Sequence, residues 1–161
     1  MKKNIILLEN IRSAYNVWNI IRTADSLWRS VWLSGYTPHP AEQPKVIKTS
    51  LGAEETVWLE RFDNAQDAID KAREFGMLVF AWELDEKAIS LGDLKTLDSS
   101  FHSEWQDNKK NTMLVLGNEV DWVLQSTLDE VDDIVYIPMN WVKESMNVGQ
   151  SAAIFMWEFG K

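Results

Sequence analysis

The chain has 161 residues, of which 45% are hydrophobic and 25% are charged, a composition typical of one globular domain that we expect to span residues 1–161. It contains no cysteine, which excludes disulfides and thiolate metal sites. Its formal net charge of −9 argues against nucleic-acid binding driven by bulk charge, and no apolar stretch approaches the ~20 residues that cross a bilayer. We therefore expect a cytoplasmic protein with neither a metal nor a membrane as a partner.

Basic side chains gather in the N-terminal third of the chain, whereas acidic side chains crowd positions 119–133. This pattern leaves two interpretations open. It can be the uneven charge of an ordinary solvated surface, or it can mark a cationic face for an anionic partner. The basic residues concerned are Arg12, Arg22, Arg29, Lys45 and Lys48.

Apolar residues in the first half of the chain alternate between short continuous runs and helical spacing. Short runs bounded by polar residues indicate buried strands, and apolar positions three or four residues apart indicate amphipathic helices. In chain order we expect a strand at 5–8, a helix at about 14–27, a strand at 30–33, a helix that Asp63 or Asn64 caps and Gly76 stops, and a strand at 77–82.

The second half of the chain continues the alternation after a polar, weakly patterned segment at about 85–111, which we interpret as loop with short turns. It predicts a strand at 113–116, a short helix near 121–129, a strand at 134–137 and a final helix at about 148–159 with Asn147 as its N-cap. Alternating strands and helices imply an α/β fold, with a mostly parallel sheet and helices on both faces.

Four short strings lie where these strands end or where the helices begin, and open α/β sheets place their ligand sites at the carboxyl ends of strands. Each string alone is explained as a strand end or a helix cap. In this order they resemble the SpoU/TrmH branch of the SPOUT RNA methyltransferases, over nearly the whole chain. The strings are NIRSAYN at 10–16 with IIRTA at 20–24, then LGNE at 116–119, IPM at 137–139 and SMNV at 145–148.

The resemblance implies more than periodicity can supply. It implies a C-terminal deep trefoil knot, a homodimer that pairs the first and last helices, and S-adenosylmethionine as cofactor. The implied activity is methyl transfer to a ribose 2′-oxygen of tRNA or rRNA. Apolar residues outside one helical stripe also favour a partner face; these residues are Tyr15, Trp18, Trp157 and Phe159.

Carried over by position, the resemblance implies a role for each group of site residues. The cofactor loops would contain Leu116, Gly117, Ile137, Met139 and Met146. The catalytic set would be Arg22, Asn16, Glu119, Ser145 and Asn147, and RNA would contact Arg12 and Lys48.

A structural role remains open for several of these residues. Ser145 and Asn147 precede a helix that either can cap, and Arg22 could be an ordinary surface arginine. If Arg22 is catalytic, positioning a phosphate or stabilising a developing alkoxide suits a guanidinium better than acting as a base, because the group hardly deprotonates.

Four tryptophans stand where the family pattern has glycine: Trp18, Trp28, Trp122 and Trp141. A glycine at the end of a helix usually adopts a left-handed conformation, and an indole at position 141 could fill the cofactor pocket. The alternatives are therefore a catalytically silent RNA-binding or assembly dimer and a knotted dimer without a ligand. A codon reassignment, in which UGA means glycine in the source cell, would also explain the pattern.

Overall fold

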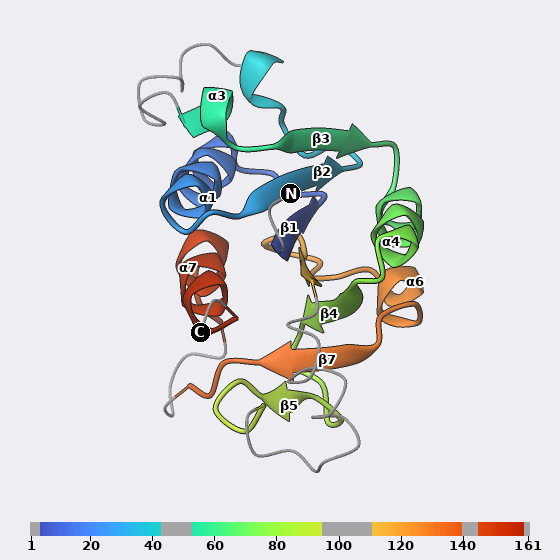
Figure 1. The fold of residues 1–161 in the computed structure, drawn as a ribbon. Coiled ribbons are helices and arrows are strands. Elements are labelled where there is room, and N and C mark those ends of the chain that lie inside the picture. The colour runs from blue at the N-terminus through green and yellow to red at the C-terminus, as the bar shows by residue number, and fades with distance from the viewer. Residues whose placement is uncertain (1–3, 43–52, 95–110, 140–144, 160–161) are drawn as a thin grey trace.

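The computed structural model describes residues 4–42, 53–94, 111–139 and 145–159. Its centre is a seven-stranded sheet in the order β3-β2-β1-β6-β4-β7-β5, and every strand pair is parallel (Figure 1). The strands are β1 (Asn4–Glu9), β2 (Ser30–Ser34), β3 (Leu59–Phe62), β4 (Leu78–Trp82), β5 (Ile89–Ser90), β6 (Thr112–Leu116) and β7 (Asp133–Tyr136).

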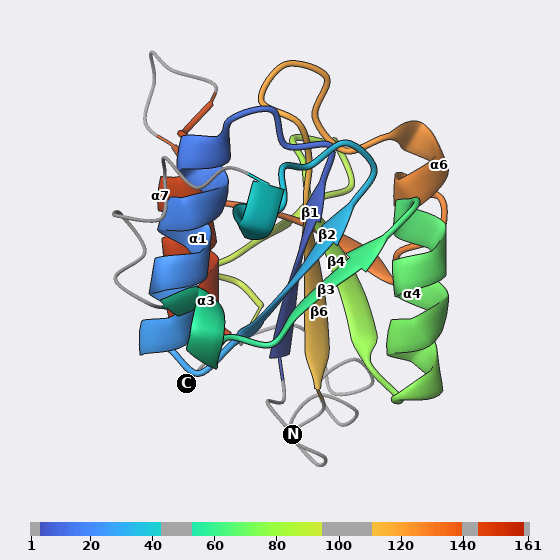
Figure 2. The same ribbon diagram turned by 90° about the horizontal axis from the view of Figure 1, so that it is seen from above.

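Helices cover both faces of this sheet, as the alternating pattern predicts. Helices α1 (Ala14–Ser26), α3 (Ala53–Thr56) and α7 (Val148–Glu158) lie on one face, whereas α4 (Ala65–Glu74) and α6 (Gln125–Leu128) lie on the other (Figure 2). A short 3-10 helix, η1 (Pro40–Glu42), follows β2. No helix in the described part of the chain is long and apolar enough to cross a membrane.

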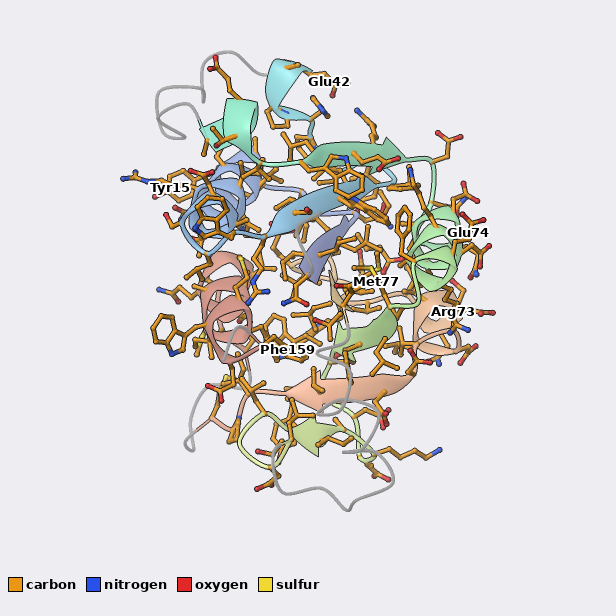
Figure 3. The ribbon with its side chains drawn as sticks, viewed as in Figure 1. Tyr15, Glu42, Arg73, Glu74, Met77 and Phe159 are labelled. Carbon is orange, nitrogen blue, oxygen red and sulfur yellow. The ribbon has the colours of Figure 1, made fainter. Side chains whose placement is uncertain are left out.

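The central strands β1 and β6 are buried on both faces of the sheet, which explains why their sequences are continuous apolar runs. In β1, Ile6 and Leu8 face the α1 and α7 side, and Ile5 and Leu7 face the α4 side. The same alternation runs through β6. Figure 3 shows Met77, just before β4, between the sheet and α4.

Side-chain caps fix where three of the helices begin. Ser13 accepts a hydrogen bond from the backbone amide of Asn16, and Asn64 accepts one from that of Asp67. Asn147 accepts one from the amide of Gly149, so the cap predicted for the last helix is confirmed. Of the two candidates for α4, Asn64 is the cap.

Several features differ from the sequence-based expectation or lie outside the described residues. Strand β5 falls within the segment 85–111 that was expected to be loop; two residues at a sheet edge give no periodic signal. The prediction that the whole of this segment is loop with short turns is therefore wrong at Ile89–Ser90. The knot stays a prediction because residues 140–144, which include Trp141, lie outside the described residues, and so does Lys48.

Candidate active site

The candidate site lies at the carboxyl edge of the parallel sheet, where the loop after β6 meets the start of α7. A cavity of about 210 Å³ opens there. Two segments far apart in the sequence form most of its wall, as the carboxyl ends of parallel strands commonly do. The described lining residues are Trp82, Gly117, Asn118, Glu119, Trp122, Ser145, Met146, Asn147 and Val148.

Gly117 allows the loop after β6 to fold back tightly on itself. A Cβ atom at this position would lie 2.2 Å from the backbone carbon of Trp122 and 2.2 Å from the backbone nitrogen of Val123. Such distances are far inside van der Waals contact, so only glycine fits. Asn118 and Trp122 close the turn with reciprocal backbone hydrogen bonds of 3.1 and 3.0 Å.

Glu119 joins this turn to the start of α1. Its carboxylate accepts hydrogen bonds from the backbone amides of Arg12 at 2.9 Å and Ser13 at 3.2 Å, and from the side-chain amide of Asn16 at 2.9 Å. Partial burial alone would raise the pKa of Glu119, but these hydrogen bonds outweigh burial and lower it. Glu119 is therefore an ionised acceptor that holds the site together.

Asn16 extends the same network to α7. Its side-chain oxygen accepts a hydrogen bond from the side-chain amide of Asn147 at 3.1 Å, and Asn16 is buried. The chain of contacts Glu119–Asn16–Asn147 thus ties together the loop after β6, helix α1 and the first turn of α7. The structure brings these three predicted residues into one cluster.

The predicted cofactor residues divide into two groups. Gly117 and Met146 line the cavity, as Ser145 does. Leu116 is the last residue of β6 and lies fully buried beneath the cavity. Ile137 and Met139 follow β7, and neither is among the described lining residues.

The predicted cationic residues within the described chain are not among those that line the cavity. Arg22 is exposed on α1, six residues beyond Asn16, which is about 9 Å further along the helix axis. Arg12 is exposed and contributes its backbone amide to Glu119. Arg29 is buried and donates to the backbone carbonyl of Met156 at 2.9 Å, so it is no part of a cationic surface.

Two carboxylates that were not predicted from the sequence, the buried Glu9 and the partly buried Glu83, anchor the other end of the turn. Glu9 accepts from the amide of Leu124 at 3.0 Å and the hydroxyl of Thr127 at 2.5 Å. Glu83 accepts from the amide of Val123 at 3.2 Å. Burial raises the pKa of both carboxyl groups. The sequence feature that could have indicated Glu9 and Glu83 is an acidic residue at or directly after the end of an apolar strand.

Aromatic side chains form the apolar wall of the cavity. The rings of Trp82 and Trp122 lie 5.9 Å apart with their planes at 55°. Trp82 ends β4 and was also missed from sequence. In the described part of the chain, no group of three or more histidine or acidic side chains could hold a metal ion.

The chain is similar to known proteins over almost its whole length. The model of the SpoU rRNA Methylase family matches residues 3–157. A tRNA (guanosine(18)-2′-O)-methyltransferase from Aquifex aeolicus is 23% identical over 158 residues, which cover 98% of this chain and 68% of the relative.

Solved structures share the fold. A TrmH-family protein from Porphyromonas gingivalis has 28% identity and a TM-score of 0.80, with 98% of this chain and 59% of that chain covered. An AdoMet-bound rRNA methyltransferase from Sinorhizobium meliloti has 23% identity and a TM-score of 0.82, with 98% and 55% covered. This chain thus spans a little over half the length of these two solved chains.

Proposed function

Because the chain belongs to the SpoU rRNA methylase family, we propose that it transfers a methyl group from S-adenosylmethionine to a ribose 2′-oxygen of tRNA or rRNA. The observation that carries this proposal is the cavity at the carboxyl edge of the sheet, with Glu119, Asn16 and Asn147 joined across it. The Aquifex aeolicus relative is named for the same type of reaction on tRNA.

The residues at the cavity fit S-adenosylmethionine in kind. Gly117 lines the cavity without a side chain, and Trp82 and Met146 supply apolar surface for an adenine ring or a thioether. We assign Leu116, Gly117, Ile137, Met139 and Met146 to cofactor binding. When bound, S-adenosylmethionine supplies an activated methyl group on a sulfonium centre. The related enzyme from Sinorhizobium meliloti is described with AdoMet bound.

The reaction asks the protein mainly to position its reactants. A ribose hydroxyl must lie in line with the methyl carbon, lose its proton and displace the thioether, and correct alignment alone lowers such a barrier greatly. Arg22 is proposed to hold the adjacent phosphate or the developing alkoxide, because charge-assisted hydrogen bonds from guanidinium suit both. Glu119, Asn16 and Asn147 hold the surrounding loops together by hydrogen bonds, and Ser145, which lines the cavity, keeps its proposed place in the catalytic set.

A homodimer would complete the site. Arg22 is exposed on α1 and is not among the described residues that line the cavity of its own chain. A second subunit packed on α1 and α7 would bring it near the partner's cavity. Tyr15 on α1 is 62% exposed and Trp157 on α7 is 60% exposed. Figure 3 shows Tyr15 on the outer side of α1. Trp18 and Phe159, which we expected on this face, instead pack into the chain's own core.

The test is methyl transfer from radiolabelled S-adenosylmethionine to unmodified tRNA and rRNA transcripts, together with calorimetric binding of the cofactor. We expect binding and transfer for the parent protein and binding without transfer for Arg22→Ala. Arg73→Ala on α4, at the opposite side of the molecule, is the matched control and should retain transfer. RNA binding without cofactor binding would contradict the proposal and support a silent RNA-binding dimer.

A further inference from the structure

Three non-glycine residues in the described part of the chain have a positive φ angle: Asn10 at 54°, Trp28 at 56° and Trp122 at 62°. Asparagine adopts this left-handed conformation fairly often, whereas a bulky side chain rarely does. We infer that Trp28 and Trp122 stand at positions that the fold builds for glycine, and that the source cell reads their codons as glycine.

Trp28 occupies the position directly after the C-cap of α1. Its backbone amide donates to the carbonyl of Asp25 at 3.2 Å, and the amide of Arg29 donates to the carbonyl of Ala24 at 2.8 Å. This pair of hydrogen bonds is the Schellman motif, in which the left-handed residue is usually glycine. The indole is 78% exposed, so burial of the ring contributes little to offset the backbone strain.

Helix α4 ends in the same motif, and there the chain does have glycine. The amide of Gly76 donates to the carbonyl of Arg73 at 2.9 Å, and the amide of Met77 donates to the carbonyl of Ala72 at 3.1 Å. Gly76 has a φ angle of 67°. Two helices of one molecule thus end with one geometry, and tryptophan replaces glycine in only one of them.

Trp122 is held in its left-handed conformation from several sides. Its backbone pairs with Asn118 in both directions and presses against Gly117, as described above. The backbone amides of the next two residues, Val123 and Leu124, donate hydrogen bonds to the carboxylates of Glu83 and Glu9. The backbone therefore cannot relax to suit a large side chain, so the strain falls on the residue itself.

Two other tryptophans of the described chain, Trp32 and Trp58, have no positive φ angle and lie beside other aromatic rings. Trp32 is fully buried in β2, with its ring 5.7 Å from that of Trp58 and 4.9 Å from that of Phe62. At this position the indole ring fills buried space and packs against two other aromatic rings. Trp28 and Trp122 thus differ in structure from Trp32 and Trp58. Such a difference is expected if some codons translated as tryptophan are read as glycine in the source cell and others are true tryptophan codons.

The coding sequence tests the second half of the inference directly. We expect UGA at positions 28 and 122, a codon that different genetic codes assign to tryptophan or to glycine. The internal controls are Trp32 and Trp58, for which we expect UGG. UGG at either 28 or 122 would overturn the codon assignment.

Thermal unfolding of purified variants tests the first half. Trp28→Gly and Trp28→Ala both remove the indole, so their difference isolates the cost of a Cβ atom in the left-handed conformation. We expect the glycine variant to have a folding equilibrium constant ~5- to 30-fold larger than the alanine variant. The same comparison at position 122 should have the same sign.

Ser26, the last residue of α1, is the matched control because it lies within the helix. There the order should reverse, since glycine is less stable than alanine in a helix. If the alanine variants at positions 28 and 122 are as stable as the glycine variants or more stable, the inference that the fold favours glycine at these positions is wrong. Neither the coding sequence nor the unfolding experiment measures methyl transfer, so both outcomes are independent of the proposed function.

Discussion

At the scale of single residues, Glu119 determines how α1 meets the loop after β6. One carboxylate accepts from two backbone amides and from Asn16, and the lowered pKa keeps it ionised at neutral pH. A low-pKa carboxylate is a weak proton acceptor, so its role is to position Asn16 and, through it, Asn147. The reacting groups must therefore include a side chain beyond this network.

Arg22 is the residue that we assign to the reacting ribose or its phosphate. Arg22→Ala should reduce the rate of methyl transfer by about 10²- to 10³-fold, the usual effect of removing one donor to a developing oxyanion. The cofactor affinity should remain unchanged, because we assign the side chain to the ribose or phosphate of the RNA and not to S-adenosylmethionine. Single-turnover kinetics and calorimetry check the two parts, and full turnover by the variant would reject the assignment.

Glu9 gives a prediction about pH. Burial raises the pKa of this carboxyl above its ordinary value of 4.5, so between the unfolded and folded pKa values the native state binds more protons than the unfolded state. Stability must then fall as the pH rises through that window. Glu9→Gln removes the titration, so its stability relative to the parent should improve from pH 4.5 upward.

Denaturant unfolding of both proteins from pH 4.5 to pH 7 checks this prediction. Glu83 and Asp133 also have pKa values raised by burial, but they are present in both proteins and cancel in the difference. A stability difference between Glu9→Gln and the parent that does not change with pH would show that Glu9 has no raised pKa.

Among the structural elements, the turn from Asn118 to Trp122 forms part of the wall of the cavity. The volume of about 210 Å³ is below the ~300 Å³ at which pockets for molecules of this size usually begin, and the Trp122 ring occupies part of the wall. A left-handed tryptophan also costs ~1–2 kcal/mol of backbone strain. The same residue therefore affects both the stability of the turn and the room for a ligand.

Trp122→Gly should bind S-adenosylmethionine about 10- to 100-fold more tightly than the parent, which corresponds to ~1–3 kcal/mol. The physical reason is that the ligand no longer has to displace the ring from Trp82. Calorimetry measures the change, and Trp28→Gly is the control because position 28 lies at the far end of α1 and should leave affinity unchanged. Equal affinity in Trp122→Gly and the parent would show that the ring does not obstruct the cavity.

The sequence predicted elements with a strong local signal and missed contacts that no local signal carries. The apolar runs of β1 and β6 and the Asn147 cap could be read directly, because periodicity and capping act over a few residues. The bond between Asn147 and Asn16 joins residues 131 positions apart, and the two-residue strand β5 depends on its partner β7. Such features arise only when the chain is folded.

For the molecule as a whole, we propose that the outer faces of α1 and α7 form the interface of a homodimer. Tyr15, Ile154 and Trp157 are exposed there, and we expect a homodimer at micromolar concentration by light scattering. Tyr15→Arg combined with Trp157→Arg should give monomers, because buried unpaired charge is costly. Phe75→Arg at the end of α4 is the control and should leave the dimer intact. A monomeric parent protein would contradict the assembly.

The most direct test of the proposed methyl transfer is to determine which atom of the RNA carries the methyl group. RNA treated with the protein and S-adenosylmethionine should be digested to nucleosides and analysed by mass spectrometry. We predict a nucleoside methylated on its ribose 2′-oxygen, formed by the parent protein and lost with Arg22→Ala. A methyl group on a base, or none on any tRNA or rRNA while the cofactor binds, would contradict it.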